Sequence, residues 1–526
     1  MAASHVPTPS FATRAPRWNG ATLDRWLLRA CLWLPLIALL LFFALPMLSV
    51  AWRSLTNDST GAIGLGNYQA LLHTPGIWRA VANSLLLGGS TTAITVLLGF
   101  VIAYGIERTA MPGKRLIGMT LSLPVLAPSL VLGLGLIFLL GRNGVVGKML
   151  DMRPDIYGFW GLLIADVLYA LPQAVLIIRA ALRYGDARQY EAAEMLGAGG
   201  WRQFFDITLP GVRYGLLSAA FVVFTVTITD FGNAVVIGGN FSVLATEIYN
   251  QVSGQMKFGM GAVVGIVLLL PAALSVWIER VAARRQAMAG GEGALPPVPR
   301  HLPARDIPVF LLSLTVAVSI ALVIFTVVMA SFIRLWPYRL DFTLRHYNID
   351  LAGGYASLWT SVWLSAMPVA VPGLVLGLSY VFAFNTADWP WGALYGSALL
   401  IALCNYMHYH TQGYATMMTG MRNVPGALED AVTVLGGGVG RTLSDVYLPA
   451  VRTTLVAVGL FLFMRSMVTL SAVIFLVTPD VPLAAVTVMR LDEAGFTSQA
   501  AAFSTCIMAI VATMAALLHA LVRPRR

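Results

Sequence analysis

Charged residues are scarce in this sequence. They make up 11% of the 526 residues, whereas 58% of the residues are hydrophobic. Soluble globular domains contain about 25% charged residues, because their surfaces face water. The composition therefore excludes an ordinary soluble domain and indicates that lipid surrounds most of this chain.

Cysteine is also rare. Cys31, Cys404 and Cys506 all lie in apolar runs, and their spacing offers neither a disulfide framework nor a metal site. We expect all three to be small core residues. His408 and His410 stand two positions apart on an expected helix, so they point in different directions and are not expected to share a metal ion.

Motifs for catalysis are missing. The phosphate-binding pattern GxxxxGK followed by Ser or Thr is absent, since the only Gly-Lys pairs, Gly113-Lys114 and Gly147-Lys148, continue with Arg and Met. No zinc or serine-hydrolase pattern is present either. We therefore expect no enzyme activity and no cofactor in this chain.

Long apolar runs fill most of the sequence. A helix needs roughly 20 apolar residues to cross a bilayer, and it satisfies its own backbone hydrogen bonds there. The runs lack the short alternating pattern of all-β membrane proteins. We predict an all-α polytopic membrane protein with about 11 or 12 transmembrane helices. Hydropathy places eleven of them at about 30–51, 80–106, 116–140, 158–182, 214–237, 259–280, 307–332, 357–384, 392–412, 453–477 and 498–522.

Positive charge has a clear distribution. The formal net charge is +10. When the loops between the spans are assigned alternately to the inner and outer side, starting with the N-terminus inside, most of the 34 lysines and arginines fall on the inner side. This is the positive-inside pattern, so the charge indicates topology and not nucleic-acid binding. We expect a multi-pass protein of the bacterial inner membrane.

The chain contains two copies of one loop. The stretch YEAAEMLGAGGWRQFFDITLPGVR begins at Tyr190, and EDAVTVLGGGVGRTLSDVYLPAVR begins at Glu429, at a constant offset of 239 residues. Such repetition is typical of transporters built from duplicated halves. We divide the chain into a disordered cytoplasmic tail (1–29), a first repeat (30–286), a flexible cytoplasmic linker rich in Gly and Pro (287–306) and a second repeat (307–526).

This loop resembles the cytoplasmic coupling loop of permeases in type I ATP-binding-cassette (ABC) importers. The alanines favour a compact helix, the glycine can end it, and the proline breaks the chain before the next span. The resemblance implies that each loop docks in a groove of an ATPase subunit. The matching residues are Glu191, Ala192, Ala193, Gly197, Leu209 and Pro210 in the first copy, and Asp430, Ala431, Gly436, Leu448 and Pro449 in the second.

The second copy departs from the pattern, because Asp430-Ala431-Val432 replaces Glu191-Ala192-Ala193. Its grip on an ATPase is therefore expected to differ in strength. The resemblance also implies two kinds of partner. One is a dimer of ABC ATPase subunits, which would hold ATP and Mg, and the other is a soluble solute-binding protein on the outer side.

Two further stretches narrow the resemblance. Residues 229–264 and 471–495 are similar to fused permeases for 2-aminoethylphosphonate, which implies that small phosphonate as substrate. The related permeases of ferric-iron and thiamine importers are the alternatives. A secondary transporter driven by an ion gradient is the competing class, because it would also show repeats and polar residues within the membrane.

The second repeat is shorter than the first. Pro128 matches Pro372 at an offset of 244, whereas Ser84 matches Ser361 at an offset of 277. About 33 residues, roughly one spanning helix with its turn, are therefore missing. Either the seventh span is inverted, or residues 334–366 cross in a broken form; a deletion that weakens function is a further alternative.

Four polar residues are candidates for the pathway, since polar side chains within a membrane are retained when they are paired or line a path. Asp166 and Asn405 are equivalent positions, Asp230 lies near the end of the fifth span, and Arg465 lies inside the symmetry mate of that span. We hypothesise that Arg465, with the two aspartates, helps an anionic phosphonate to pass. A buried ion pair or a snorkelling arginine is the alternative.

Overall fold

The computed structural model describes residues 20–58, 60–149, 151, 155–183, 185–289, 297, 299, 301–349, 353–365, 373–385, 391–422 and 424–522. Within these ranges, eight helices are long and apolar enough to cross a membrane, or nine if the bent pair Val439–Ala450 and Arg452–Val468 is one span. The predicted all-α polytopic fold is confirmed. A short two-stranded antiparallel sheet joins two of the helices.

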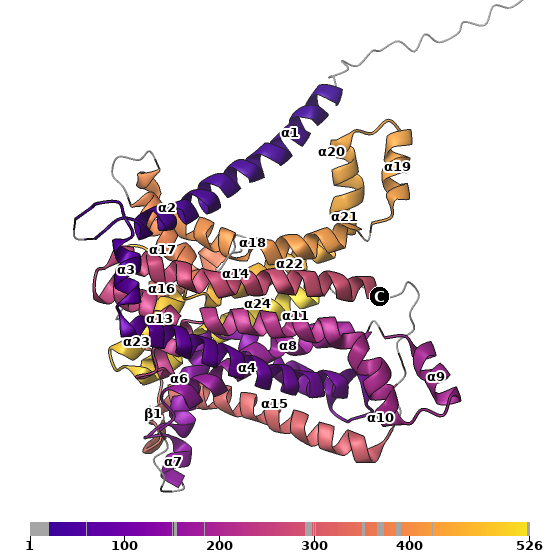
Figure 1. Cartoon of the computed structure of the whole chain (residues 1–526), viewed down its shortest axis with the longest axis horizontal. Helices are drawn as coiled ribbons and strands as arrows, with labels where there is room; N and C mark the ends of the chain where they lie inside the picture. The colour runs from indigo at the N-terminus through magenta and orange to yellow at the C-terminus, as the bar shows by residue number, and fades with distance from the viewer. Residues whose placement is uncertain are drawn as a thin grey trace, which may run out of the picture.

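The first half runs from α1 to α14 (Figure 1). Its helices are α1 (Gly20–Leu39), α2 (Leu45–Ser54), α3 (Gly66–Leu72), α4 (Pro75–Arg108), α5 (Lys114–Leu121), α6 (Ser129–Leu140), α7 (Val145–Met149), α8 (Phe159–Arg183), α9 (Ala187–Met195), α10 (Gly200–Gln203), α11 (Leu209–Thr229), α12 (Gly232–Ile237), α13 (Leu244–Tyr249) and α14 (Phe258–Ala289), with short turns η1 (Leu40–Ala44), η2 (Leu123–Leu126), η3 (Phe204–Thr208) and η4 (Asn250–Gly254).

The second half runs from α15 to α24. Its elements are α15 (Pro303–Phe332), β1 (Ile333–Leu335), β2 (Arg339–Phe342), η5 (Arg345–Tyr347), α16 (Gly354–Ser365), α17 (Gly373–Phe384), η7 (Gly392–Leu394), α18 (Ala398–Arg422), α19 (Gly426–Val434), α20 (Val439–Arg441), η8 (Thr442–Tyr447), α21 (Leu448–Ala450), α22 (Arg452–Val468), α23 (Ala484–Glu493) and α24 (Thr497–Val522).

Helix boundaries differ from the hydropathy spans where local chemistry breaks the helix. The expected span 116–140 is divided into α5, η2 and α6, because Pro124 and Pro128 cannot continue a helix. The expected span 214–237 ends as a helix at Thr229 and resumes at Gly232. At the N-terminus, α1 begins at Gly20, inside the predicted tail, and the remainder of that tail lies outside the described residues.

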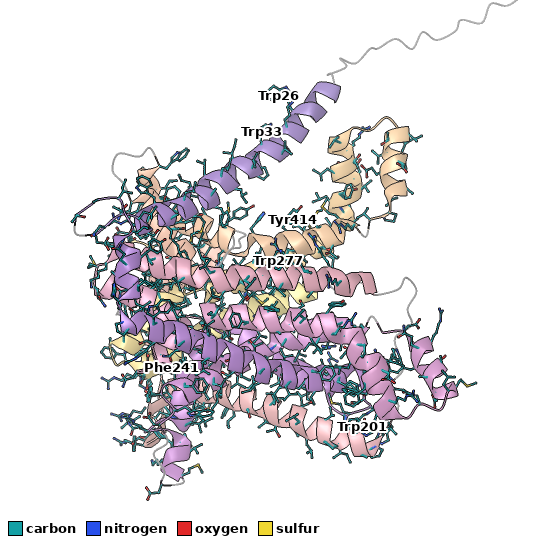
Figure 2. All side chains as sticks on the ribbon, in the orientation of Figure 1. Trp26, Trp33, Trp201, Phe241, Trp277 and Tyr414 are labelled. Carbon is teal, nitrogen blue, oxygen red and sulfur yellow. The ribbon has the colours of Figure 1, made fainter. Side chains whose placement is uncertain are left out.

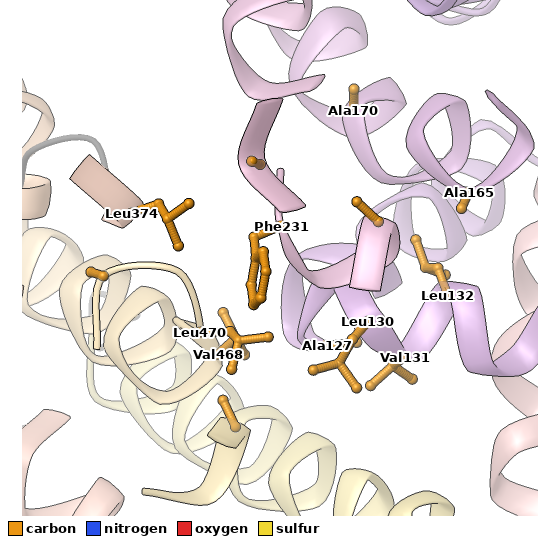
Figure 3. Packing of buried hydrophobic residues seen from close by; sticks show 14 of the residues in the cluster. Ala127, Leu130, Val131, Leu132, Ala165, Ala170, Phe231, Leu374, Val468 and Leu470 are labelled. Carbon is orange, nitrogen blue, oxygen red and sulfur yellow. The ribbon is translucent and has the colours of Figure 1, made fainter. Parts of the chain in front are cut away.

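The halves exchange their first helices. Helix α2 of the first half packs on α17 of the second, and α15 of the second half packs on α6 of the first. The buried core is consequently shared, and Figure 3 shows Phe231 between Leu130 of the first half and Leu374 and Leu470 of the second. Phe231 is completely buried, and Leu470, its equivalent at the 239-residue offset, is 4% exposed.

The shortening of the second half is divided between two helices. In the first half the Ser84 hydroxyl accepts a hydrogen bond from the Leu244 amide at 2.8 Å, and in the second the Ser361 hydroxyl accepts one from the Ala484 amide at 2.7 Å. Helix α16 is therefore the counterpart of the first turns of α4. Helix α17 is the counterpart of α6, so what is missing is the end of α4 together with α5.

This division explains how topology is kept. The expected continuous span 357–384 is two helices, α16 and α17, on either side of residues 366–372, which lie outside the described residues. Helix α16 has 12 residues and is about 18 Å long, little more than half of a hydrocarbon core of about 30 Å. Helix α15 keeps the direction expected for the seventh span, and α16 begins and α17 ends at the end of the molecule where α15 ends, so α16 and α17 together do not cross from one end to the other. The described residues thus show neither an inverted seventh span nor a crossing within 334–366.

Both repeated loops lie at one end of the molecule. Figure 1 shows α9 and α10 at the same end as α19 and α20, whereas α7, α13, α23 and β1 lie at the opposite end. Following the charge distribution, we call the end with the loops the inner end and the other the outer end. The two loops thus share a side, as the repeat requires.

This topology predicts a labelling pattern in cells. Met195→Cys and Val434→Cys, at the tips of the two loops, should react with a membrane-impermeant maleimide only after permeabilisation, whereas Tyr338→Cys at the outer end should react in intact cells. All three positions are exposed, so the membrane alone decides access. Labelling of Val434→Cys in intact cells would show that the second loop is outside.

Candidate functional site

The two repeated loops form helical hairpins of the same build. In the first, α9 is followed by a turn, α10, η3 and α11; in the second, α19 is followed by a turn, α20, η8 and α21. We call the segments 187–208 and 426–447 the first and second coupling hairpins. Glu191, Ala192 and Ala193 lie on α9, and Asp430 and Ala431 lie on α19, as predicted.

A glycine ends the first helix of each hairpin. Gly197 has φ +75° and Gly436 has φ +74°, both in the left-handed region. In each turn the glycine amide and the next amide donate to carbonyls of the preceding helix, at 2.9 Å and 2.9 Å in the first hairpin and 3.0 Å and 2.9 Å in the second. A Cβ atom at either glycine would meet nothing within 4 Å, so the backbone angle alone requires glycine there.

A proline sets the second bend of each hairpin. Pro210 and Pro449 follow wide helical turns, η3 and η8, in which the chain bonds five residues back. Proline lacks an amide hydrogen and clashes with the carbonyl four residues before it, so the wider turn relieves that clash. The Leu209-Pro210 and Leu448-Pro449 pairs therefore fix the angle at which each hairpin meets its spanning helix.

A hydrogen bond closes each hairpin, and sequence reasoning missed it. The hydroxyls of Tyr190 and Thr208 lie 2.9 Å apart, and the Tyr447 hydroxyl donates to Glu429 Oε2 at 3.0 Å. At the 239-residue offset, Tyr190 is equivalent to Glu429 and Thr208 is equivalent to Tyr447. The tyrosine therefore stands at the first of the two positions in one hairpin and at the second in the other. The bond to the Glu429 carboxylate raises the pKa of Tyr447, so its phenol stays a neutral donor. Only a comparison of paired positions could have found this contact.

The hairpin tips expose apolar side chains at an aqueous end. Met195 and Leu196 are 89% and 86% exposed, and their equivalents Val434 and Leu435 are 86% and 83% exposed. Figure 2 shows Trp201, also exposed, on the first hairpin. Large exposed apolar side chains outside lipid indicate a surface that another protein covers.

The predicted pathway residues fall into two groups. In the first half, Asp166 Oδ1 accepts from Asn233 Nδ2 at 2.9 Å, and Asp230 Oδ2 accepts from the Asn233 amide at 3.0 Å. Asn233 Oδ1 also accepts from the Gly133 amide at 3.2 Å. The two aspartates are therefore joined through Asn233, which the sequence reasoning did not single out, and they tie α8 to α6 and α12.

The second group lies between the halves. Arg465 on α22 donates to the Tyr169 hydroxyl of α8 at 3.4 Å, and its guanidinium lies 5.4 Å from the centre of the Tyr409 ring. Among the described residues, no carboxylate lies within 4 Å of its guanidinium, so the structure does not bring Arg465 together with Asp166 or Asp230. Asn405 is apart from them as well and donates to the Ser466 hydroxyl at 3.0 Å.

The histidine pair is also divided. The His408 ring packs against Tyr409, with ring centres 4.1 Å apart, whereas His410 contacts the rings of Tyr406 and Tyr414. In the part of the chain that the structure describes, no group of three His, Cys, Asp or Glu side chains is arranged to hold a metal ion.

At the outer end of the half-to-half interface, aromatic side chains close the structure. Phe231 lies at the centre of Figure 3, and its ring is 5.2 Å from that of Tyr249. Tyr249 in turn contacts Phe475 of the second half, with ring centres 6.2 Å apart. Arg465, deeper along the same interface, is only partly buried. Together these rings close the interface between the halves at the level of Phe231.

Comparison with known proteins identifies this arrangement. Residues 95–288 match the model of the family described as binding-protein-dependent transport system inner membrane component. The molybdenum transport system permease protein ModB of Azotobacter vinelandii is 33% identical over 183 residues, which cover 34% of this chain and 81% of that protein. The chain belongs to this family. It is the inner-membrane permease of a binding-protein-dependent ABC importer, and the predicted multi-pass location in the bacterial inner membrane is confirmed.

Two longer permeases are also similar to this one. The ferric transport system permease protein FbpB of Actinobacillus pleuropneumoniae is 27% identical over 83% of this chain and 70% of that protein. The thiamine transport system permease protein ThiP of Brucella abortus (strain 2308) is 34% identical over 33% of this chain and 31% of that protein.

The glycine turn generates a prediction. Gly197→Ala should raise the free energy of the hairpin by about 1 kcal/mol, because a residue with a Cβ atom resists a positive φ. Amide hydrogen exchange over residues 187–203 should therefore become faster in the purified permease. Gly200→Ala is the matched control, since Gly200 is helical and has open space for a methyl group. Equal exchange in the two variants would contradict this role of Gly197.

Proposed function

We propose that this permease forms the translocation pathway of an importer driven by a separate ABC ATPase. The observation that carries the proposal is the pair of matched coupling hairpins, each with a glycine turn, a closing hydrogen bond and an exposed apolar tip at one end of the molecule. These tips are the surface on which two ATPase subunits would dock.

The mechanism follows from how the hairpins are attached. Each hairpin continues into a spanning helix, α11 or α22, and those helices end close to Phe231 and Leu470. Closure of the ATPase dimer on nucleotide would draw the hairpins together, so α11 and α22 would rock and separate the outer ends of the halves. The interface between the halves is then the two-state element that alternating access needs.

Family membership argues against the ion-coupled secondary transporter that the sequence left open, and reconstitution tests the driving force directly. In proteoliposomes that contain the permease, its ATPase and its binding protein, uptake should require ATP and should persist when ionophores collapse all ion gradients. Uptake that continues without ATP and stops with ionophores would favour the competing class.

For the substrate, we propose a small anion, of which 2-aminoethylphosphonate or a similar phosphonate is our specific candidate. Arg465 supports an anion, because a guanidinium between the halves with two tyrosines around it would attract a phosphonate and repel a bare cation. Ferric iron is the alternative, supported by the name of the Actinobacillus relative, and thiamine is a further one.

Arg465 can be tested directly. Arg465→Met should lower phosphonate uptake by at least about tenfold, the size expected from losing one charged hydrogen bond, while expression stays normal. Arg465→Lys should keep part of the activity, since it retains the charge but not the planar fork. Unchanged uptake in Arg465→Met would show that the arginine is only structural.

The outer end offers a docking surface for the solute-binding protein. A hollow of about 980 Å³ is lined from the first half by Arg142, Tyr157 and Phe241, and from the second by Trp336 and Tyr338. Aromatic and arginine side chains are the residues that dominate protein interfaces. Because both halves line this hollow, a binding protein docked there would contact both halves, and its contacts would change when the halves separate.

The β1–β2 hairpin beside this hollow is held firmly and is basic. Trp336 Nε1 donates to the Phe138 carbonyl at 2.9 Å, and Lys148 donates to the Pro337 carbonyl at 3.1 Å. Next to it, a hollow of about 280 Å³ is lined by Arg334, Arg339, Arg345 and His346. A binding protein with carboxylates at the matching position would complement this charge.

The basic hollow predicts an electrostatic contact. The double variant Arg334→Glu, Arg345→Glu should weaken capture of the binding protein about tenfold and reduce its salt dependence. Lys257→Glu, an exposed charge change at the outer end of the first half, is the matched control. Biolayer interferometry on the permease in nanodiscs measures the affinity of each variant for the binding protein. Equal affinities of the double variant and the control would exclude this docking position.

A further inference from the structure

The first coupling hairpin is clamped to a neighbouring spanning helix. The Phe204 ring lies 5.9 Å from those of both Phe100 and Tyr104 on α4, in edge-to-face contacts. One turn further along α4, the Arg108 guanidinium lies 5.1 Å from the centre of the Tyr190 ring. Residues four positions apart share one face of a helix, so a single stripe of α4 grips both arms of the hairpin.

Arg108 also fixes this stripe to the rest of the half. Its Nη2 donates to the Leu182 carbonyl at 2.7 Å, in the last turn of α8, where helix carbonyls lack partners of their own. The side chain is 8% exposed. One buried cation therefore joins α4, α8 and α9, and the first hairpin cannot tilt without moving two spanning helices.

Among the described residues, the second hairpin has no counterpart of this clamp, although its helix α20 approaches α1. The stripe of Phe100, Tyr104 and Arg108 belongs to the part of α4 that the shortening removed, since residues 366–372 stand where 89–128 stand in the first half. The second hairpin also lacks the two side chains that the clamp holds in the first. Leu443, 55% exposed, replaces Phe204, and Glu429 replaces Tyr190.

Burial of the supporting helices agrees with this loss. Val175 on α8 is 3% exposed, whereas its equivalent on α18, Tyr414, is 57% exposed and labelled at the edge of the bundle in Figure 2. The inner part of α18 thus lacks the cover that α4 gives to α8.

We propose that the two coupling hairpins are mechanically unequal. The first, clamped through Arg108 and Phe204, moves its half as a rigid lever, whereas the second pivots on α18 and α22. Movement of the ATPase dimer is therefore transmitted mainly through the first hairpin. The transmission step rests on the proposed function, but the difference in rigidity does not.

Matched spin labels measure the rigidity in the permease alone. With the three native cysteines replaced, Trp160→Cys with Met195→Cys reports on the first half, and Leu399→Cys with Val434→Cys reports on the equivalent positions of the second. All four side chains are exposed. In lipid nanodiscs, pulsed electron paramagnetic resonance should give a narrow distance distribution for the first pair and a broad one for the second. Equal widths would overturn the proposal.

Variants of the clamp provide the second arm. Arg108→Met, and separately Phe204→Leu, which introduces the residue of the second hairpin, should each broaden the first distribution towards the second. Arg115→Met is the matched control, because it removes an exposed charge nearby and should leave the width unchanged. A first distribution that stays narrow in either folded clamp variant would show that the clamp does not set the rigidity.

The assembled importer tests the transmission step. Arg108→Met should lower substrate uptake about tenfold, in line with the loss of one charged hydrogen bond, while ATP hydrolysis continues. Uptake equal to that of Arg115→Met would contradict transmission through the first hairpin. If no ATPase binds the permease at all, the proposed function fails, and the widths of the label distributions still decide whether the hairpins are unequal.

Discussion

The two coupling hairpins lie at the same end of the molecule, and this constraint governs how the rest of the chain can be arranged. In lipid, every backbone amide and carbonyl must be paired, so the chain crosses as helices and can change sides only by whole crossings. A second half that had lost one complete crossing would place its hairpin on the wrong side. The structure avoids this because the equivalents of the end of α4 and of α5 are both missing, so α16 and α17 enter and leave at the same end.

That solution has consequences for packing. In the first half, Val309 of α15 packs against Gly105 of α4, and Phe310 approaches Gly113. By symmetry, α1 should pack on the corresponding part of the second half, which is the part that is missing. Its side chains Trp26, Trp33 and Leu34 are accordingly 70%, 55% and 70% exposed. The exposed α1, the exposed inner part of α18 and the lack of a clamp on the second hairpin among the described residues therefore fit one cause, the missing segment of the second half.

Sequence reasoning predicted the features that depend on local chemistry. Gly197, Gly436 and the Leu-Pro pairs act through backbone angles, which the residue types themselves determine. The sequence pattern therefore predicted the positions of these turns. Hydropathy alone does not separate α16 from α17, because it sees one apolar run across 357–384 whatever its path. Pro368 and Pro372 can bend such a run, but they lie outside the described residues.

The candidate site was harder to predict from the sequence where the contacting side chains come from distant segments. Arg465 was singled out by its charge, but its contacts with Tyr169 and Tyr409 depend on how the halves meet. Asn233, which joins Asp166 to Asp230, is an uncharged residue with no motif around it. Likewise, the clamp on the first hairpin is a stripe of α4 that reads as ordinary apolar span, and only the packing of α4 on the hairpin reveals it.

The central claim is that an external ATPase drives both hairpins, and site-specific photo-crosslinking tests it most directly. A photoreactive amino acid would replace Leu196 or Leu435 at the two tips, with Tyr338 at the outer end as the control. In intact membranes, both tips should crosslink to one nucleotide-hydrolysing protein and Tyr338 should not. Tips that crosslink to no such protein, in cells where uptake is active, would contradict the account.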